Sequence, residues 1–453
     1  MAGARKVCSV FVLLLFFSFS ERPGFSYSLL THQQIIDLAW KDSIVPMLLS
    51  RYPHATPAEL ERARSYAYGG STIQDAGYYP FGHEFFSDLT HYVRSGDFVA
   101  SLIRNARNIN ELAFALGALS HYVGDCIGHD DAVNPSTAIE FPSLEEKYGP
   151  VVTYDESPHG HVRTEFAFDI DQLSKRRLAP SAYLDHVGLN VSTRLLEQAF
   201  FETYGLHLRS MEINRKAVVE TYRWSVRNFL PSIARAEVVL HKKDFPADAP
   251  GPEFDLYVKR VEEADAINGW EKYRKQKAGF KTHLLAVVIV VVPKIGIISD
   301  LSIRGPQPET EQRYIESVNR TVDRYEQLLG YLTRKPREEP RISMNLENRD
   351  LDTGDKVRPG GYRLTDWTYA RLLDKITTLR EPIPAALQRD ILAYYADPDA
   401  PIATRKKPHA WKRVQDQLAV LQTMPVIHRN FDPDEPSQAD NGRANGSQIN
   451  TNQ

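Results

Sequence analysis

Apolar residues recur three and four positions apart through most of the first 240 residues, which is the period of an amphipathic α-helix. The spacing is clear in Ile35 to Ala39, in Leu112 to Leu119 and in Val218 to Phe229. No alternating strand pattern accompanies it, so the pattern predicts helices almost throughout His32 to Lys242. Clusters of Pro, Gly and Ser predict loops at 52–57, 69–82 and 134–160.

The second half of the chain follows a Pro- and Asp-rich stretch, Asp244 to Pro252, which predicts a linker. Charged and Pro-rich residues 335–361 predict a long loop, and residues from about Asn430 onward lack apolar side chains and predict a disordered tail. Helical periodicity between these segments predicts helices at 309–332, 366–378, 385–395 and 411–423. The chain is therefore expected to be mainly α-helical in both halves.

The first 26 residues have the layout of a secretory signal peptide. Arg5 and Lys6 precede an apolar run that Pro23 ends, and a small-x-small pattern follows at Gly24, Phe25 and Ser26. The run is too short to cross a hydrocarbon core of about 30 Å comfortably. We predict cleavage after Ser26, which would make Tyr27 the new N-terminus and would place the protein in a secreted or periplasmic compartment.

A second apolar run, LLAVVIVVV from Leu284 to Val292, continues past a proline and a lysine to Ile298. Nine residues cannot cross a bilayer as a helix. Its β-branched content favours an extended segment buried in the core. The alternatives are a hairpin of Leu284–Ile298 at a membrane surface and a transmembrane helix.

The charge of the chain argues against a nucleic-acid-binding surface. Its 55 basic and 58 acidic residues give a net charge of −3, and removing Arg5, Lys6, Arg22 and Glu21 with the signal peptide leaves −5. With Cys8 also removed, Cys126 would be the lone thiol, which we expect to be buried.

The chemistry is concentrated in histidine and carboxylate spacing. His121, Asp125 and His129 stand at i, i+4 and i+8, which on a helix covers an arc of only about 80°. His161 and Glu165 repeat the i, i+4 spacing. Imidazoles and carboxylates without thiolates are typical ligands of a catalytic zinc site. One such pair alone is more typical of a surface or capping arrangement, but burying all of them without metal would leave costly unpaired polar groups.

Upstream residues supply further candidates in the same region, namely His32, Asp75, His83 and His91. The ordered set of His32, Asp75, His91 in LTHY, the His121–Asp125–His129 series and His161–Glu165 resembles the zinc-dependent phospholipase C family. The resemblance covers about Tyr27 to Phe229, and the broader superfamily includes single-strand nucleases. It implies an N-terminal helical bundle of the zinc-dependent phospholipase C type, followed by a C-terminal, mostly helical region of unknown fold.

The resemblance also implies a centre of three zinc ions. One ion would be held by Asp75, His91, His121 and Asp125. A second would be held by His129, His161 and Glu165. The third would take His32, Asp125 as a bridging carboxylate, and the amino group and carbonyl of Tyr27 once the signal peptide is removed. Family members usually have Trp at that terminus, but the ligand there is backbone. His83 is an alternative to His91, and His159 is an alternative to His161.

The domain layout that follows is a signal peptide (1–26), a catalytic domain (27–243), a C-terminal helical region (244–429) and a tail (430–453). The implied activity is phosphodiester hydrolysis by metal-activated water, with Asp75 orienting or deprotonating that water. His161-x3-Glu165 is the phospholipase form of the motif, so a phospholipid is the expected substrate. Ala76 stands where phosphatidylcholine-hydrolysing members carry an aromatic residue, which leaves the head group open. The alternatives are a secreted zinc nuclease or other phosphoesterase, and a non-catalytic zinc or membrane-binding module.

Overall fold

The computed structural model describes residues 29–79, 82–211, 247–248, 250–274, 305–334 and 344–428. Helices dominate these ranges, and the prediction of a mainly α-helical protein is confirmed. The helices of the first half, in chain order, are α2 (Leu29–Ala39), η1 (Trp40–Ile44), α3 (Val45–Arg51), α4 (Pro57–Gly70), η2 (Gln74–Gly77), α5 (Glu84–Tyr92), α6 (Ser95–Asn105), α7 (Ile109–Gly128), η3 (His129–Val133), α8 (Asn134–Glu140), α9 (Pro142–Tyr148), α10 (Pro158–Ser174), α11 (Ser181–Val187), α12 (Thr193–Tyr204) and η4 (Leu208–Met211).

The second half adds helices and a two-stranded parallel sheet in which Ile383 pairs with Val426. Its predicted helices are confirmed to within a few residues. In chain order, the elements of this half are α15 (Pro252–Asn268), α16 (Glu271–Arg274), α19 (Pro308–Thr333), α20 (Arg363–Leu379), β1 (Ile383–Pro384), α21 (Ala385–Tyr394), η6 (Ala403–Lys406), α22 (Pro408–Thr423) and β2 (Val426–Ile427).

Helix α7 is the centre of the fold, and its apolar residues from Leu112 to Leu119 are buried. Helix α4 packs directly on it at two glycines. A Cβ at Gly70 would lie 2.0 Å from the carbonyl oxygen of Phe114, and a Cβ at Gly117 would lie 2.1 Å from that of Ala67. Because no side chain fits at either point, glycine is required for the two backbones to approach this closely.

The loop predicted at 134–160 is wrong for most of its length, because α8, α9 and the start of α10 lie within it. Each of these helices has a proline in its first turn: Pro135, Pro142 and Pro158. A proline costs nothing at that position, since the missing N–H has no intrahelical partner there. Proline is typical of loops as well as of first helical turns, and here it lies in the first turns of helices.

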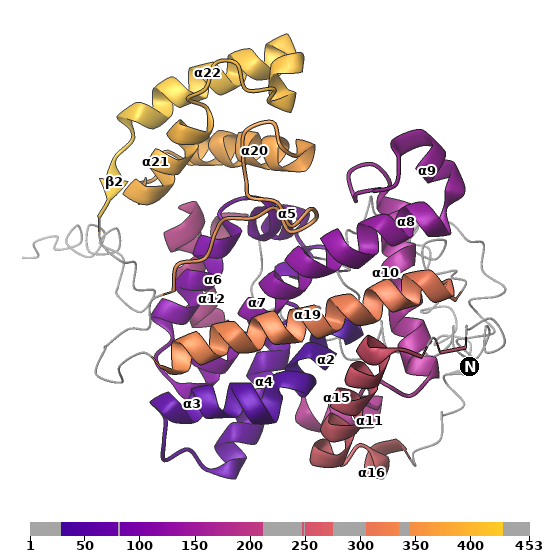
Figure 1. Cartoon of the computed structure of the whole chain (residues 1–453). Helices are drawn as coiled ribbons and strands as arrows, with labels where there is room; N and C mark the ends of the chain where they lie inside the picture. The colour runs from indigo at the N-terminus through magenta and orange to yellow at the C-terminus, as the bar shows by residue number, and fades with distance from the viewer. Residues whose placement is uncertain are drawn as a thin grey trace, which may run out of the picture.

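The two halves share one hydrophobic core. Helix α19 packs on α7 and α2, and it crosses the bundle in Figure 1, where α20, α21 and α22 gather beside α5 at one end. Polar contacts join the same elements: the Tyr325 hydroxyl donates to the carbonyl of Leu116 at 2.9 Å, and the hydroxyls of Tyr314 and Thr31 lie 2.8 Å apart. The C-terminal half therefore contributes directly to the surroundings of α7 and α2.

Several predicted segments lie outside the described residues. They are the signal peptide with Tyr27, the helical pattern of Val218 to Phe229, the apolar run Leu284–Ile298, residues 244–246 and 249 of the linker, and the tail from 430. In the ranges that are described, no helix has both the length and the apolar character needed to cross a bilayer.

Candidate metal centre

Three groups of buried imidazoles and carboxylates lie close together in the N-terminal half. In each group, one ligand atom from every member lies within 4.8 Å of the others. Every member is at most 1% exposed. The groups are His32–His121–Asp125, Asp75–His91–His121 and His129–His161–Glu165.

Asp125 lies at the meeting point of the first two groups. Its Oδ2 is 2.9 Å from Nε2 of His121, one helical turn earlier on α7. Its other oxygen, Oδ1, is 3.3 Å from Nε2 of His32 on α2. A carboxylate that turns one oxygen to each of two imidazole sets has the geometry needed to bridge two cations.

Asp75 and His91 complete the second group. Asp75 lies on the short 3₁₀ turn η2, and His91 lies in the last turn of α5. Nε2 of His91 is 3.2 Å from Oδ1 of Asp75 and 3.5 Å from Oδ2 of Asp125. Nε2 of His121 is 3.7 Å from the same oxygen of Asp75. These four side chains surround a common centre.

The third group lies further along the same helical face. His129 is eight residues after His121, a rise of about 12 Å, so it reaches a separate group. α7 changes to π-helical turns at His129, a form often found at functional sites. Nε2 of His129 and Nε2 of His161 approach the same oxygen, Oε1 of Glu165, at 3.3 and 2.8 Å.

Backbone carbonyls fix the orientation of three imidazoles. Nδ1 of His91 lies 2.8 Å from the carbonyl oxygen of Ser87, and Nδ1 of His121 lies 3.0 Å from that of Ser71. Nδ1 of His129 lies 2.6 Å from the carbonyl oxygen of Leu351. A carbonyl only accepts, so each Nδ1 must donate. Nε2 is then the nitrogen of each ring that faces the carboxylates and would ligate a metal, which is the usual arrangement around metal-bound histidines.

Buried polar atoms in these groups lack hydrogen bonds among the described residues. They include Nε2 of His91, Nε2 of His121 and both oxygens of Asp125, although these atoms approach one another to between 2.9 and 3.5 Å. Unsatisfied buried polar groups cost about 1–3 kcal/mol each. Divalent metal ions at these points would satisfy them, and nitrogen and oxygen donors without sulfur suit zinc in a catalytic role. The residues present therefore fit zinc.

Electrostatics keeps the carboxylates of the first two groups ionised. Burial would raise the pKa of Asp75, but His121 and His91 outweigh it, and the pKa falls below its usual value. The same opposition holds at Asp125, where His121 and His32 hold the pKa well below the usual range. Both side chains therefore offer the charged form that binds a cation.

The pKa values of the imidazoles shift in opposite directions. Burial lowers the pKa of His32, and the neighbouring His121 lowers it further. At His91 burial acts in the same sense, but nearby Asp125 raises the pKa well above its usual value. At His129, Glu165 outweighs burial and raises the pKa to about 9. A metal ion binding at His91 or His129 must therefore displace a tightly held proton.

The two alternative histidines lie outside the three groups. His83 caps the N-terminus of α5, whereas His91, eight residues later, lies beside Asp75. His159 is exposed on the first turn of α10, whereas His161 lies beside Glu165. Tyr27 lies outside the described residues, two positions before the start of α2.

Two tyrosines border the centre. The ring of Tyr78 lies 5.3 Å from that of His91, and the ring of Tyr154 lies 5.7 Å from that of His161. The Tyr78 hydroxyl also donates to Asp88 at 3.2 Å. No spacing signal in the sequence singles out Tyr154, and none could identify the Leu351 carbonyl, because a backbone group has no residue signature.

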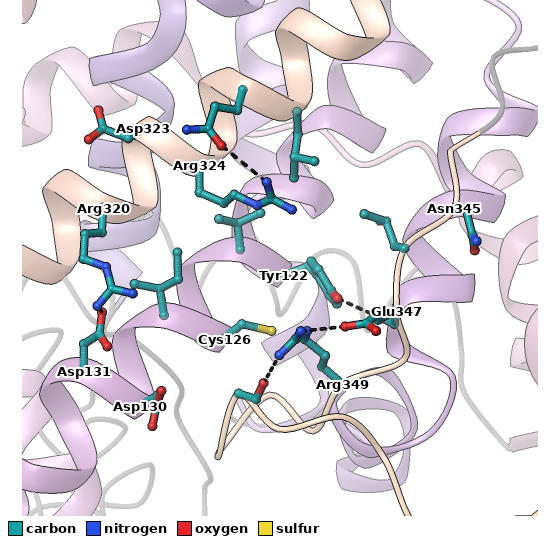
Figure 2. A pocket seen from close by; sticks show the side chains of 16 residues that line it. Tyr122, Cys126, Asp130, Asp131, Arg320, Asp323, Arg324, Asn345, Glu347 and Arg349 are labelled. Atoms are coloured by element: carbon teal, nitrogen blue, oxygen red, sulfur yellow. Dashed lines mark hydrogen bonds and ion pairs between the residues drawn. The ribbon is translucent and has the colours of Figure 1, made fainter.

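Cys126 follows Asp125 but points away from the three groups. We expected a buried thiol, yet Cys126 is half-buried in the wall of a cavity of about 650 Å³. Successive residues of an α-helix are rotated by about 100°, so Asp125 and Cys126 lie on different faces of α7. Figure 2 shows the cavity, whose lining includes Tyr122, Arg320 and Arg349 but no member of the three groups.

Comparison with known proteins relates the N-terminal half of the chain to one family. Residues 31–214 match the sequence model of a family described as zinc dependent phospholipase C. No curated protein and no solved structure matched the chain. The match contains all eight clustered residues and ends before the C-terminal half. The match confirms the resemblance of the N-terminal half to the zinc-dependent phospholipase C family.

Proposed function

We propose that this protein is a secreted zinc-dependent phospholipase C, which releases the phosphorylated head group from a phospholipid. One observation carries the proposal: eight buried imidazoles and carboxylates converge in three groups, inside the region that matches the family. A zinc-dependent phosphodiesterase-like function follows from the family. The lipid substrate and the secretion are the steps we add.

We assign three zinc ions to the groups. The first takes Asp75, His91, His121 and Asp125, and the second takes His129, His161 and Glu165. The third takes His32, the bridging Asp125, and the amino group and carbonyl of Tyr27. The separation of the two Asp125 oxygens supports the bridge, because each oxygen faces a different imidazole. The third site needs cleavage after Ser26, since a longer chain has no free amino group at Tyr27.

Phosphodiester hydrolysis suits this centre. Bound zinc lowers the pKa of a water molecule and stabilises charge that develops on the phosphoryl oxygens. The protein supplies the remaining elements. Asp75 is ionised, as its lowered pKa shows, and can accept a proton from the attacking water. The carbonyl-bound imidazoles of His91, His121 and His129 keep their tautomers fixed throughout the reaction.

A phospholipid is favoured over a nucleic acid as the substrate. The matched family points to lipid, the His161-x3-Glu165 motif has the phospholipase form, and the slightly acidic net charge of −3 does not favour binding to nucleic acid. Tyr78 and Tyr154 place aromatic rings beside both ends of the centre. The apolar run Leu284–Ile298 is our candidate for contact with the lipid surface.

The decisive experiment measures metal content and both activities on one sample. The mature protein is assayed on phospholipid vesicles and on single-stranded DNA, and zinc is counted by mass spectrometry. We expect about three zinc ions and lipid hydrolysis, both lost in His121→Ala. The control is His207→Ala, because His207 pairs with Glu197 outside the three groups.

Each contrary outcome has a distinct meaning. DNA cleavage without lipid hydrolysis would establish the nuclease alternative. Zinc binding without either activity would point to a non-catalytic zinc or membrane-binding module. A protein free of zinc would overturn the proposal altogether.

A further inference from the structure

A loop from the C-terminal half lies against the metal centre. Residues 344–362, here called the 344–362 loop, fold back on themselves through an antiparallel bridge between Arg349 and Lys356. The turn of this hairpin-like loop contains Leu351, which is fully buried. The family match ends at residue 214, so nothing in that match accounts for this loop.

Leu351 touches two of the three groups through its backbone alone. Its N–H donates to the carbonyl oxygen of His91 at 3.1 Å. Its carbonyl oxygen accepts from Nδ1 of His129 at 2.6 Å. One peptide segment therefore joins α5, which carries His91, to the end of α7, which carries His129.

The next residue strengthens the same attachment. The Asp352 carbonyl accepts from Nδ2 of Asn134 at 2.7 Å, and its carboxylate accepts from the hydroxyls of Tyr92 and Tyr362, each at 2.8 Å. Tyr92 directly follows His91 on α5, and Asn134 begins α8. The loop is thus bonded to both sides of the centre at two successive residues.

The rest of the loop holds this turn in place. The Ser95 hydroxyl on α6 donates to the carbonyl oxygen of Arg349 and accepts from its N–H. Gly354 has a φ of +71°, and a Cβ there would lie 2.4 Å from the carbonyl oxygen of Cys126. Figure 2 shows Arg349 on the cavity side of the loop, bonded to Glu347 and to the carbonyl of Gly354.

We propose that the 344–362 loop is a positioning element of the zinc centre and that the Leu351 carbonyl holds His129 in its metal-binding tautomer. The inference rests on the proposed zinc site. Hydrogen-bond partners behind a metal-bound histidine fix the ring and raise its basicity, and their loss typically costs 10- to 100-fold in metal affinity. The C-terminal half is then required for zinc to stay bound, although it supplies no ligand.

The test displaces the loop without touching a ligand. Gly354→Ala adds a methyl group that meets the backbone of Cys126, so the loop and α7 must separate. Gly188→Ala is the matched control: its φ of +80° imposes a similar backbone strain, but no atom lies within 4 Å of the added Cβ. Zinc is loaded into both variants and into the parent protein, and its release to a chelator is followed.

We expect one of about three ions to leave Gly354→Ala roughly 10- to 100-fold faster than from the parent, and Gly188→Ala to match the parent. Proton NMR adds a direct readout, because the Nδ1–H of His129 should exchange slowly in the parent and in the control but rapidly in Gly354→Ala. A parent protein that binds no zinc would instead refute the proposed function.

A second pair of variants keeps the test valid if Gly354→Ala does not fold. Ser95→Ala removes both hydrogen bonds to Arg349. The control is Ser101→Ala, which removes a buried hydroxyl from the same helix; this hydroxyl donates to Glu202 and not to the loop. Faster zinc release from Ser95→Ala alone supports the proposal. Equal release from Gly354→Ala and Gly188→Ala, or from both serine variants, would overturn it.

Discussion

His32 and His121 stack with their ring centres 4.2 Å apart and their planes 25° from parallel. The two rings come from α2 and α7, and both approach Asp125. Face-to-face imidazoles at this distance cannot both carry a positive charge cheaply, which agrees with the lowered pKa of His32. The lowered pKa favours the neutral form of His32, which is the form of an imidazole that can ligate a metal ion.

Asp125→Asn should remove the bridge between two ions. An amide offers one oxygen and no charge, so we expect zinc content to fall from three ions to about one. Activity should fall by more than about 100-fold, because losing a ligand costs more than losing a hydrogen-bond partner behind a ligand, which typically costs 10- to 100-fold. Asp130→Asn is the control, because Asp130 is exposed on the π-helical continuation of the same helix. Retention of all three ions in Asp125→Asn would refute the bridging role.

The two histidines of α10 should behave differently. His161→Ala should lose one ion and most of the activity, because His161 lies 2.8 Å from Glu165. His159→Ala, two residues earlier and exposed, should keep the metal content and rate of the parent. Zinc counting and vesicle hydrolysis on both variants decide the choice that the sequence left open. The reverse result would assign the ligand to His159.

The N-terminus of the mature chain should be a ligand through its backbone. Mass spectrometry of the secreted protein should find Tyr27 first. Tyr27→Trp should bind three ions, because the side chain takes no part, whereas a mature chain that begins at Ser26 should bind two. Three ions in the Ser26 form would remove Tyr27 from the centre.

Asp37 should give the fold a pH dependence. Burial raises the pKa of this carboxyl to about 6, although Arg64 and Tyr68 oppose the shift. The folded protein then holds the proton more tightly than the unfolded chain, so this contribution to stability is full below about pH 4 and is lost as the pH rises through about 6. The shift corresponds to about 3 kcal/mol.

Urea unfolding of the parent protein and of Asp37→Asn at several pH values measures this effect. The difference between their unfolding free energies should change by about 2 kcal/mol between pH 4 and pH 6, in favour of the variant at the higher pH. A difference that does not vary with pH would contradict the raised pKa.

The helices and the chemistry of the centre were accessible from sequence for different reasons. Apolar residues recur three and four positions apart in α19 and α20 because each helix buries one face, and this spacing predicts a helix from sequence. His121 and Asp125 were recognisable because one helical turn fixes their spacing. The pairing of His91 with Asp75 rested on resemblance, because η2 and α5 meet only through the tertiary fold.

Other features had no signal in the sequence. Proline is common both in loops and in the first turn of a helix, so the pattern predicts a loop where α8 and α9 lie. The attachment of Leu351 to His129 joins residues 222 positions apart through a backbone oxygen. No side-chain pattern records such a contact. The domain boundary at 244 stays a prediction, although α15 and α19 pack on α2.

The Leu351 contact also sets an order of events during biosynthesis. All the side-chain ligands lie within the first 165 residues and leave the ribosome early, but the carbonyl that orients His129 arrives with residue 351. Domains generally begin to fold as the chain emerges. A nascent chain would therefore hold its metals loosely until residue 351 had been made, and a product truncated before this residue would be a poor competitor for zinc.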